Sequence, residues 1–349
     1  MSSSNSKQNQ EKESKMAHTI SEVSGRPEMF YVGEKPWHGL GTELEQPATA
    51  SEAIQAASLD WQVELEPLYL KQQGVIGGYQ EVPEKQGVVR QDSRDVLGIV
   101  TERYEPIQNQ EAFSFMDAVI GLGQAVYETA GALGKGEKVW LLAKLPGEMR
   151  IASNEEDRIE KYLLLTNFHD GMHSLRVFWT TVRVVCQNTL TLAFSNGKAV
   201  KEGVAIRHTG EIKDKVAEAQ RVLGLSVKYY DELSEAFNRL AARQVNSAEV
   251  KAYFEAIVPD NRKARRNTRT QNIRRELQEL FVSGRGNDLP GVRGTGWALL
   301  NAVTQYTTHR KSRGRTEREQ QENRLNSLFY GSSAELNVRA FNQALELLK

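Results

Sequence analysis

The sequence predicts an α+β protein, with a helix-plus-antiparallel-sheet domain at residues 18–205 and a helical, basic C-terminal region after it. The first observation is a series of short apolar runs before residue 190 that alternate with polar residues, as strands do. The second is the three- and four-residue spacing of apolar positions after Gly210, which is typical of helices. The third is size, because 349 residues with 39% apolar side chains can bury a sizeable core.

The first 17 residues form a polar tail that we expect to be disordered and to carry no chemistry. Residues 1–17 are rich in Ser, Asn, Gln, Lys and Glu, and Met16 offers an alternative start. The segment does not resemble a signal peptide, and no apolar run is long enough to cross a membrane. A single cysteine, Cys186, excludes an intrachain disulfide and a zinc site built on several thiolates. We therefore expect a soluble, cytoplasmic protein.

The α+β domain begins with a loop and a short capped helix. The segment GEKPWHGLGTEL is punctuated by proline and glycine, and Thr49-x-x-Glu52 is a capping box that opens a helix through Leu59. A second helix is capped by Asn109 and closes near Gly121. Alternation predicts strands at 61–65, 96–104, 125–130, 139–145, 162–166 and 175–186.

A long helix with a heptad pattern follows within residues 206–258. The apolar seam alternates spacings of four and three residues through Ile212, Val216, Ala219, Leu223, Ser226, Tyr230, Leu233, Phe237 and Leu240. An exposed stripe of this length is poorly soluble, so the seam needs a partner helix. That helix lies either elsewhere in the chain or on another subunit, because intramolecular hairpins use the same period.

Residues 259–349 form the predicted basic helical region. Thr268-x-x-Gln271 caps one helix, and the glycine-rich segment 283–296 separates it from the next helix at 297–309. A basic loop then leads into a last helix that ends at Leu348.

A formal net charge of zero hides an asymmetry between the two halves of the chain. Residues 1–200 contain 19 Lys and Arg against 27 Asp and Glu, a net charge of −8, whereas residues 201–349 contain 26 against 18, a net charge of +8. Residues 262–315 contain 13 basic residues, eleven of them arginine, and three acidic ones. Because arginine grips phosphate oxygens with a planar fork of donors, this segment predicts a polyanionic partner. The alternative is a solvated helix face or pairing with the acidic half of the same chain.

The candidate nucleic-acid-binding residues come from this basic segment and from one predicted strand. Strand arginines beside aromatic residues are one way in which sheets hold single strands, although the same arginines could pair with the acidic half. The candidates are Arg262, Lys263, Arg265, Arg266, Arg269, Arg274, Arg275, Arg310, Lys311, Arg313, Arg315, Arg176 and Arg183.

Catalytic and metal-binding motifs give weaker signals. His169 and His173 flank Asp170, but their spacing spans a predicted hairpin turn, so the two imidazoles need not converge on a metal. A turn-stabilising role is the simpler interpretation. The segment GALGKGEK lacks the order of a phosphate-binding loop, and no partner signature accompanies Cys186. We therefore assign no catalytic residue, no metal site and no cofactor.

Four motifs carry a resemblance to a known family. They are PWHGLGT, RQDSRDVLGIVTERYEPIQNQEAFSFMD, YLLLTNFHDGMHSLRVFWTTVRVVCQNTL and GTGWALLNAVTQYTTH. Over most of residues 25–310 the chain resembles the phage- and plasmid-like family catalogued as domain of unknown function 932. Positions that match its pattern are Trp37, His38, Gly39, Gly98, Tyr104, Gln108, Asn109, His169, Asp170, Gly171, Arg183, Cys186, Asn188 and Asn301. The resemblance implies a mobile-element context and no settled activity.

Residues and resemblance together favour a single-stranded DNA-binding protein of a phage or plasmid, a homo-oligomer that promotes strand annealing or recombination. A helix, a β-meander and further helices look like the core of single-strand annealing proteins of the Rad52-like kind, which is an analogy at the level of fold. Annealing needs no bond chemistry, which agrees with the absence of catalytic motifs. Two alternatives remain open: a metal-dependent nuclease that uses His169, Asp170 and His173, and an interaction or inhibitor module that contacts a host protein through the acidic half. The sequence does not choose between DNA and RNA.

Overall fold

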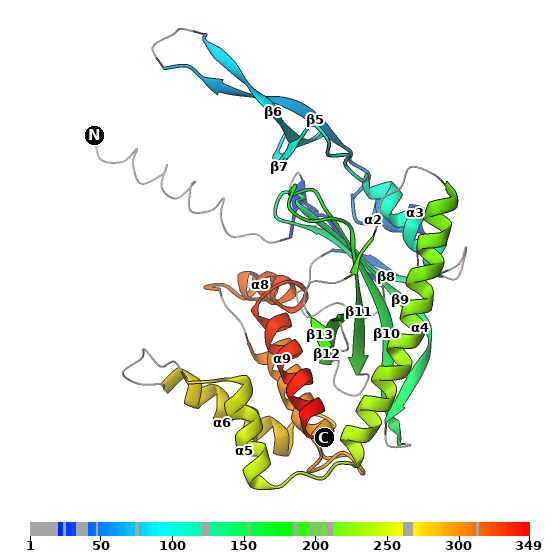
Figure 1. Ribbon diagram of the computed structural model, residues 1–349, viewed down its shortest axis with the longest axis vertical. Helices are drawn as coiled ribbons and strands as arrows, with labels where there is room; N and C mark the ends of the chain where they lie inside the picture. The colour runs from blue at the N-terminus through cyan, green and yellow to red at the C-terminus, as the bar shows by residue number, and fades with distance from the viewer. Residues whose placement is uncertain are drawn as a thin grey trace.

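The computed structural model describes residues 20–23, 26–32, 41–46, 48–73, 77–120, 126–151, 154–183, 188–195, 198–200, 204–206, 212–260, 268–311 and 314–349. The predicted tail at 1–17, the loop around Trp37 and the lone Cys186 lie outside these residues. Within them the chain combines a central sheet with helices on both of its faces (Figure 1). The predicted α+β class is therefore confirmed.

The central sheet is almost entirely antiparallel. Its strands lie in the order β13-β12-β11-β10-β9-β8-β3-β4, with β14 beside β11, and the pair β3 and β4 is parallel. The bounds are β3 (Met29–Val32), β4 (Thr42–Leu44), β8 (Val126–Leu133), β9 (Lys138–Ile151), β10 (Asn154–Phe168), β11 (Arg176–Arg183), β12 (Asn188–Ser195), β13 (Lys198–Val200) and β14 (Val204–Ala205). A separate pair joins β1 (Glu22–Val23) to β2 (Arg26–Pro27).

Side chains alternate between the two faces of this sheet, and each face has its own cover. Leu141, Leu163 and Trp179 point into a core shared with α2 (Ala50–Ala56), α3 (Asn109–Ile120) and α4 (Ile212–Ala242). Trp140, Leu164 and Phe178 occupy the opposite face, where they pack against α8 (Glu317–Phe329). The rings of Trp140 and Phe329 meet with centroids 5.9 Å apart. The sheet therefore forms the middle of three layers.

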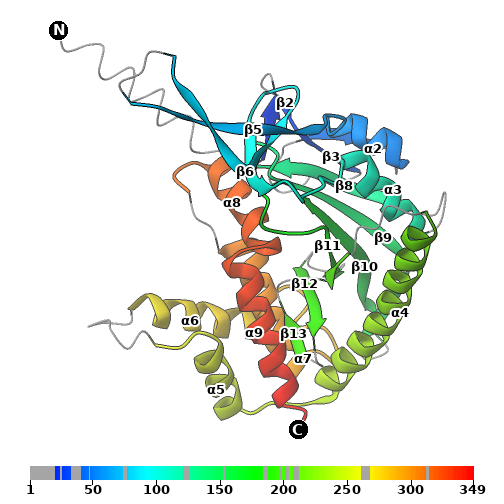
Figure 2. The same ribbon diagram turned by 45° about the horizontal axis from the view of Figure 1, so that its top comes forward.

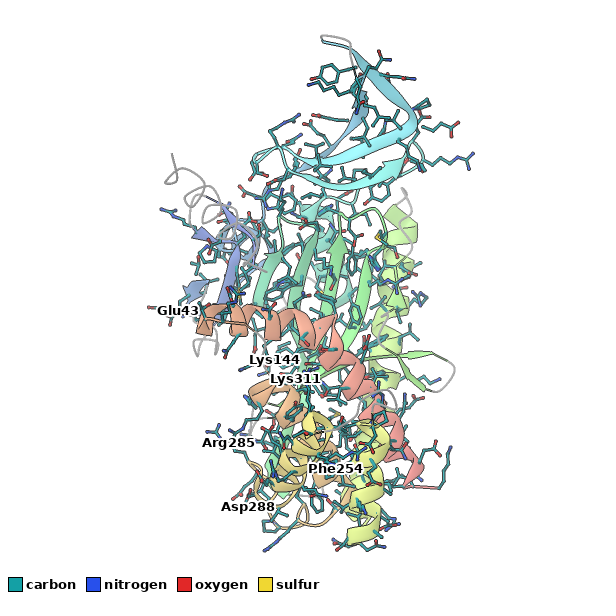
Figure 3. The ribbon with its side chains drawn as sticks, turned by 90° about the vertical axis from the view of Figure 1, so that its left-hand side faces the viewer. Glu43, Lys144, Phe254, Arg285, Asp288 and Lys311 are labelled. Atoms are coloured by element: carbon teal, nitrogen blue, oxygen red, sulfur yellow. The ribbon has the colours of Figure 1, made fainter. Side chains whose placement is uncertain are left out.

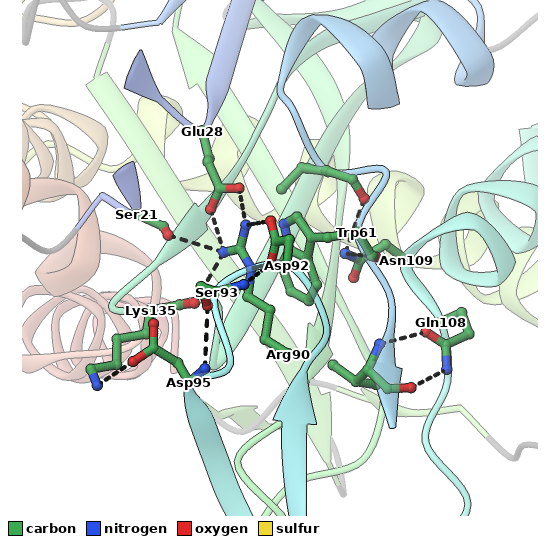
Figure 4. Close-up of polar contacts among 12 residues, drawn as sticks. Ser21, Glu28, Trp61, Arg90, Asp92, Ser93, Asp95, Gln108, Asn109 and Lys135 are labelled. Carbon is green, nitrogen blue, oxygen red and sulfur yellow. Dashed lines mark hydrogen bonds and ion pairs between the residues drawn. The ribbon is translucent and has the colours of Figure 1, made fainter. Parts of the chain in front are cut away.

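A second, three-stranded sheet projects from the top of the molecule (Figures 1 and 2). It contains β5 (Val63–Lys71), β6 (Tyr79–Arg90) and β7 (Val96–Thr101), all antiparallel. We call it the arm. Arg90 at the end of β6 is buried and fixes the arm to the body: it bonds Glu28 and Asp92 and lies over the Trp61 ring, 4.1 Å from its centroid (Figure 4).

The heptad-patterned segment forms α4, a helix of 31 residues. The described side chains of its seam are buried except Leu223, which is 41% exposed. Part of the seam packs on the chain's own sheet: the Trp179 Nε1 donates to Ser226 Oγ at 2.9 Å, and the Tyr230 hydroxyl donates to Thr180 O at 3.0 Å. Nearer the end of α4, the ring of Phe237 packs against Trp297 and Phe341 from the C-terminal helices. Of the two alternatives left open by the sequence, the first holds: the seam is buried inside the chain, against both strands and helices.

The C-terminal region is helical, as predicted. It comprises α5 (Ser247–Ile257), α6 (Thr268–Ser283), α7 (Gly296–Gln305), the π-helix η1 (Tyr306–Arg310), α8 and α9 (Ser332–Glu346). All ten residues of α7 are buried, so this helix is the centre of the region. The single last helix predicted from the sequence is two helices, because Gly331 caps α9 and separates it from α8. In the described part of the chain, no helix is long and apolar enough to cross a membrane.

Candidate nucleic-acid interface

A cavity of about 370 Å³ lies among the C-terminal helices. It is formed where the end of α5 meets α6, η1 and the start of α9, segments up to about 80 residues apart in the sequence. Its lining residues are Ile257, Val258, Pro259, Arg269, Ile273, Glu276, Tyr306, Arg310, Lys311, Ser332, Glu335, Leu336 and Arg339. Figure 3 shows Lys311 between the central sheet and the lower helices.

Cations outnumber carboxylates around the cavity, four to two. Lys311 donates from Nζ to Ser332 Oγ at 2.9 Å, and Arg339 donates from Nη1 to the carbonyl of Ile257 at 2.7 Å. Among the described residues, no hydrogen bond or ion pair engages the exposed guanidinium of Arg269 or Arg310. These two groups keep their donors available for an anion.

The π-helix η1 positions two of the four cations. Lys311 N donates to Tyr306 O at 2.8 Å, a bond that spans five residues and closes the wide turn. The opposite side of η1 is anchored, because Thr307 Oγ1 donates to Asn337 Oδ1 at 2.9 Å and Thr308 Oγ1 accepts from Thr189 N at 3.1 Å. Consequently Arg310 and Lys311 sit on a turn fixed to both α9 and the central sheet.

Tyr306 supplies a neutral hydroxyl at the same cavity. Burial, together with the negative charge of Glu276, raises the pKa of Tyr306, and the charge of Arg269 only partly opposes this rise. The hydroxyl therefore stays protonated at neutral pH and remains a hydrogen-bond donor.

Three of the sequence-predicted residues, Arg269, Arg310 and Lys311, thus meet around one cavity. Arg274 does not line it: its Nε donates to Val258 O at 3.0 Å and its Nη2 lies 3.3 Å from Asp260 Oδ1, so it holds the end of α5. Arg275 is exposed on α6, where it donates to Asn272 Oδ1 at 2.8 Å.

The remaining predicted residues do not line the cavity or cannot be placed. Arg315 is exposed just before α8, and Arg176 begins β11 on the central sheet. The side chain of Arg183 lies outside the described part of the structure, and so do Arg262, Lys263, Arg265, Arg266 and Arg313.

Sequence reasoning missed Arg339 and the two carboxylates, Glu276 and Glu335. Arg339 lies beyond the arginine-rich segment, on α9, where one turn of helix separates it from Glu335. No cluster of charge marks it in the sequence. Its signal is its position on the same side of α9 as Leu336 and Glu335, which becomes informative only when α9 is known to pack beside α5.

A second group of polar side chains is buried between the arm and α3. His169 is fully buried, and its Nε2 lies 3.0 Å from Asn109 Oδ1. Asn109 uses its amide nitrogen to donate to Leu59 O at 3.1 Å, so its oxygen faces Nε2 as an acceptor, and the amide nitrogen of Asn167 lies 3.3 Å from the same Nε2. The other ring nitrogen, Nδ1, is buried without a hydrogen-bond partner among the described residues.

Asp170 and His173 form a separate arrangement on the turn that follows. Asp170 accepts from the backbone N–H groups of Met172 and His173, and its Oδ2 lies 2.8 Å from His173 Nδ1. This is the turn-stabilising role predicted for them. His169 points away into the core, so the three side chains do not converge. Across the described chain, no group of three or more His, Cys, Asp or Glu side chains is arranged to hold a metal ion.

The family model described as domain of unknown function (DUF932) matches residues 96–329 of the 349-residue chain. The chain belongs to the DUF932 family. This confirms the resemblance predicted from the motifs, although PWHGLGT precedes the matched DUF932 region. No curated protein matches the chain, and no solved structure does.

Several residues of the motifs that carried the resemblance meet where the arm joins the body. Gln108 bonds both backbone groups of Val63 at 3.0 Å (Figure 4), and the Tyr104 hydroxyl donates to Phe168 O at 3.4 Å. A Cβ on Gly98 of β7 would lie 2.5 Å from the carbonyl carbon of Asp170, so only glycine fits there. Gln108, Tyr104 and Gly98 therefore help to position the arm.

We expect the buried imidazole to make this DUF932 protein sensitive to mild acid. Burial lowers the pKa of His169 from 6.5 to about 4, so below pH 6.5 the unfolded chain binds a proton that the folded chain excludes. Stability is therefore complete above pH 6.5 and is lost as the pH falls toward 4. The free energy of unfolding should fall by about 2 kcal/mol between pH 7 and pH 5 from this group.

Urea titrations at the two pH values measure this effect in the wild type and in His169→Gln. The variant removes the group that titrates and should lose most of the pH dependence, whatever its stability at pH 7. The control His173→Gln alters an exposed imidazole of the same turn and should keep the pH dependence. An unchanged pH dependence in His169→Gln would contradict the assignment.

Proposed function

We propose that this protein binds single-stranded DNA and that the cavity between α5, α6, η1 and α9 receives the phosphates of the strand. The observation that carries the proposal is the convergence of Arg269, Arg310 and Lys311, together with Arg339, around one cavity. The guanidinium group of arginine binds phosphate oxygens with two parallel hydrogen bonds. A guanidinium that has no other partner does not have to break an existing hydrogen bond before it binds phosphate.

The form of the site favours a flexible strand. A cavity of about 370 Å³ falls within the size range of sites that enclose small molecules, so it accommodates a single nucleotide. A single strand can turn one nucleotide into such a cavity, whereas a duplex is a stiff rod that presents only its outer phosphates. The hydroxyl of Tyr306 and the two carboxylates supply polar contacts for the sugar or base.

Strand annealing in a phage or plasmid is the activity that this binding would serve. Annealing proteins hold a strand and catalyse no change in its covalent bonds, so they need no metal, cofactor or nucleophile. A homo-oligomer that acts in the cytoplasm, with several cavities along one strand, fits this role because phosphate contacts supply affinity without reading sequence.

Binding of a fluorescent oligonucleotide across a range of salt concentrations tests the proposal. One nucleotide in the cavity brings only the phosphates on either side of it, so two neutralised phosphates should give a slope of log affinity against log salt of about −1.4, at roughly 0.7 per phosphate. Several sequences of equal length should bind with similar affinities. A single-stranded RNA and a duplex of the same sequence complete the comparison. An affinity that does not change with salt concentration, or no binding at all, refutes the proposed function.

A further inference from the structure

A second hollow lies at the C-terminal end of α6. It has a volume of about 620 Å³, and its lining residues are Val282, Ser283, Gly284, Arg285, Gly286, Asp288 and Arg293. Most of them belong to the glycine-rich segment 283–296 that connects α6 to α7, and none of them lines the cavity. Figure 3 shows Arg285 and Asp288 at the lower end of the molecule, below Lys311.

The backbone around the hollow is held in place by buried contacts. Asn287 is fully buried, and its amide nitrogen donates to Leu280 O at 3.0 Å and to Ala298 O at 3.1 Å. Arg285 N donates to the side-chain oxygen of Gln305 at 3.1 Å. These bonds fix the glycine-rich segment to both α6 and α7, so the hollow is a built feature of the fold.

Two arginines of the hollow carry guanidinium groups that keep their donors available. Arg285 and Arg293 are exposed, and within the described chain neither guanidinium makes a hydrogen bond or an ion pair. Asp288 also lines the hollow, whereas Glu279, exposed on the last turns of α6, does not. The lining thus has a net charge of +1, which matches the single negative charge of one phosphodiester.

The hollow follows the cavity along α6. Glu276 lines the cavity and Val282 lines the hollow, which puts about 9 Å of helix axis between them at 1.5 Å per residue. Ser283 lies seven residues after Glu276 and therefore on the same side of the helix. Gln305, which holds the glycine-rich segment, immediately precedes the cavity residue Tyr306. A strand that leaves the cavity along α6 would reach the hollow within about three nucleotides, at roughly 3.4 Å per stacked nucleotide.

We propose that the hollow is a second phosphate site for the strand whose nucleotide occupies the cavity. Arg285 and Arg293 bind one further phosphodiester of that strand, and Val282, which is 61% exposed, offers an apolar surface to the adjoining base. Asp288 limits the hollow to the charge of a single phosphate. The inference rests on the proposed function and adds to it the direction in which the strand leaves the cavity. Because the second contact is intramolecular, it strengthens the binding of long strands only.

Binding of two oligothymidylates, followed by ligand-observed NMR titration so that weak binding is measurable, tests the second site. One is a 5′-phosphorylated dinucleotide, which fills the cavity alone, and the other has about twelve nucleotides and spans both sites. Arg285→Gln with Arg293→Gln should weaken binding of the longer oligonucleotide by about fivefold and leave the dinucleotide unchanged. The salt slope of the longer one should become shallower by about 0.7. Thermal unfolding should change little, because both arginines are exposed.

Asp288→Asn should have the opposite effect, because it removes a carboxylate that repels the phosphate. Binding of the longer oligonucleotide should strengthen by about twofold, and that of the dinucleotide should not change. The control Arg26→Gln with Arg103→Gln removes two exposed arginines that line neither the hollow nor the cavity. This variant should bind both oligonucleotides like the wild type.

The proposed function and the second site fail in different ways. A wild type that binds neither oligonucleotide refutes the proposed function, and the second site with it. If the wild type binds both, an unchanged affinity of the longer oligonucleotide for the Arg285 and Arg293 variant overturns the second site alone. An equal loss for both lengths overturns it as well, because the two arginines would then act on the cavity itself.

Discussion

Replacing Arg269, Arg310 and Lys311 together with glutamine should weaken the binding of single-stranded oligonucleotides by about 100-fold at moderate salt. Contacts to charged groups are each worth roughly 1.5 kcal/mol or more when fully formed, and partial exposure reduces this value, so three of them correspond to about two orders of magnitude. The salt slope should become shallower by about 1, because the cations share the phosphates of one nucleotide and each neutralised phosphate contributes roughly 0.7. All sequences should be affected alike, because phosphate contacts carry no sequence information.

A matched control distinguishes binding at the cavity from attraction by the net charge of the protein. The control variant combines Arg26→Gln, Arg103→Gln and Lys251→Gln. Like the cavity variant, it removes the charges of two arginines and one lysine, but at exposed positions that do not line the cavity. This variant should bind nearly as tightly as the wild type. Equal losses in both triple variants would show that net charge alone holds the strand, and the cavity would lose its assigned role.

Removing the buried guanidinium of Arg90 should cost about 3–5 kcal/mol of stability, because it leaves a buried carboxylate without its partner. Glu28 and Arg90 are each 1% exposed, and Nη1 of Arg90 also donates to Lys135 O at 3.1 Å. In Arg90→Met the methionine fills part of the space but supplies no donor. Urea unfolding followed by circular dichroism should show a large decrease in the midpoint.

Arg94 provides the control, because it also bonds two carboxylates of the arm but does so in solvent. Its partners are Glu64 and Glu66, and all three side chains are more than a third exposed. Arg94→Met should leave the urea midpoint almost unchanged, since exposed ion pairs contribute little. If Arg90→Met unfolds at the same urea concentration as Arg94→Met, burial does not increase the contribution of the Arg90 contacts to stability.

The elements that the sequence predicted well are those with a strong local period. α4 was predicted from its heptads and the β9 and β10 strands from their apolar runs, although each strand extends beyond its predicted range. β6 was missed because Pro83 and Gly87 interrupt its alternation, and its pairing with β5 and β7 depends on contacts that are distant in sequence. The heptad period also could not tell a sheet from a helix as the partner of α4, because both accept the same apolar stripe.

The arginine-rich composition of the C-terminal region predicted only some of the residues that line the cavity. The excess of arginine indicated Arg269 and Arg310, but it could not separate them from Arg274, which lies on the same helix as Arg269 and instead bonds the end of α5. Five residues along a helix rotate a side chain to a different side, so neighbouring arginines take different roles. Arg339 could not be predicted without the packing of α9, since tertiary contact is what brings it to the cavity.

The attachment of the arm has a consequence for substitutions at its exposed positions. Besides Gln108 and the buried valines of its strands, the guanidinium of Arg90 ties the end of β6 to Glu28, and the backbone of Gly98 lies directly against the backbone around Asp170. None of these contacts uses the exposed side chains of Leu70 or Ile99. Polar substitutions at those two positions should therefore leave the base of the arm attached to the body as in the wild type.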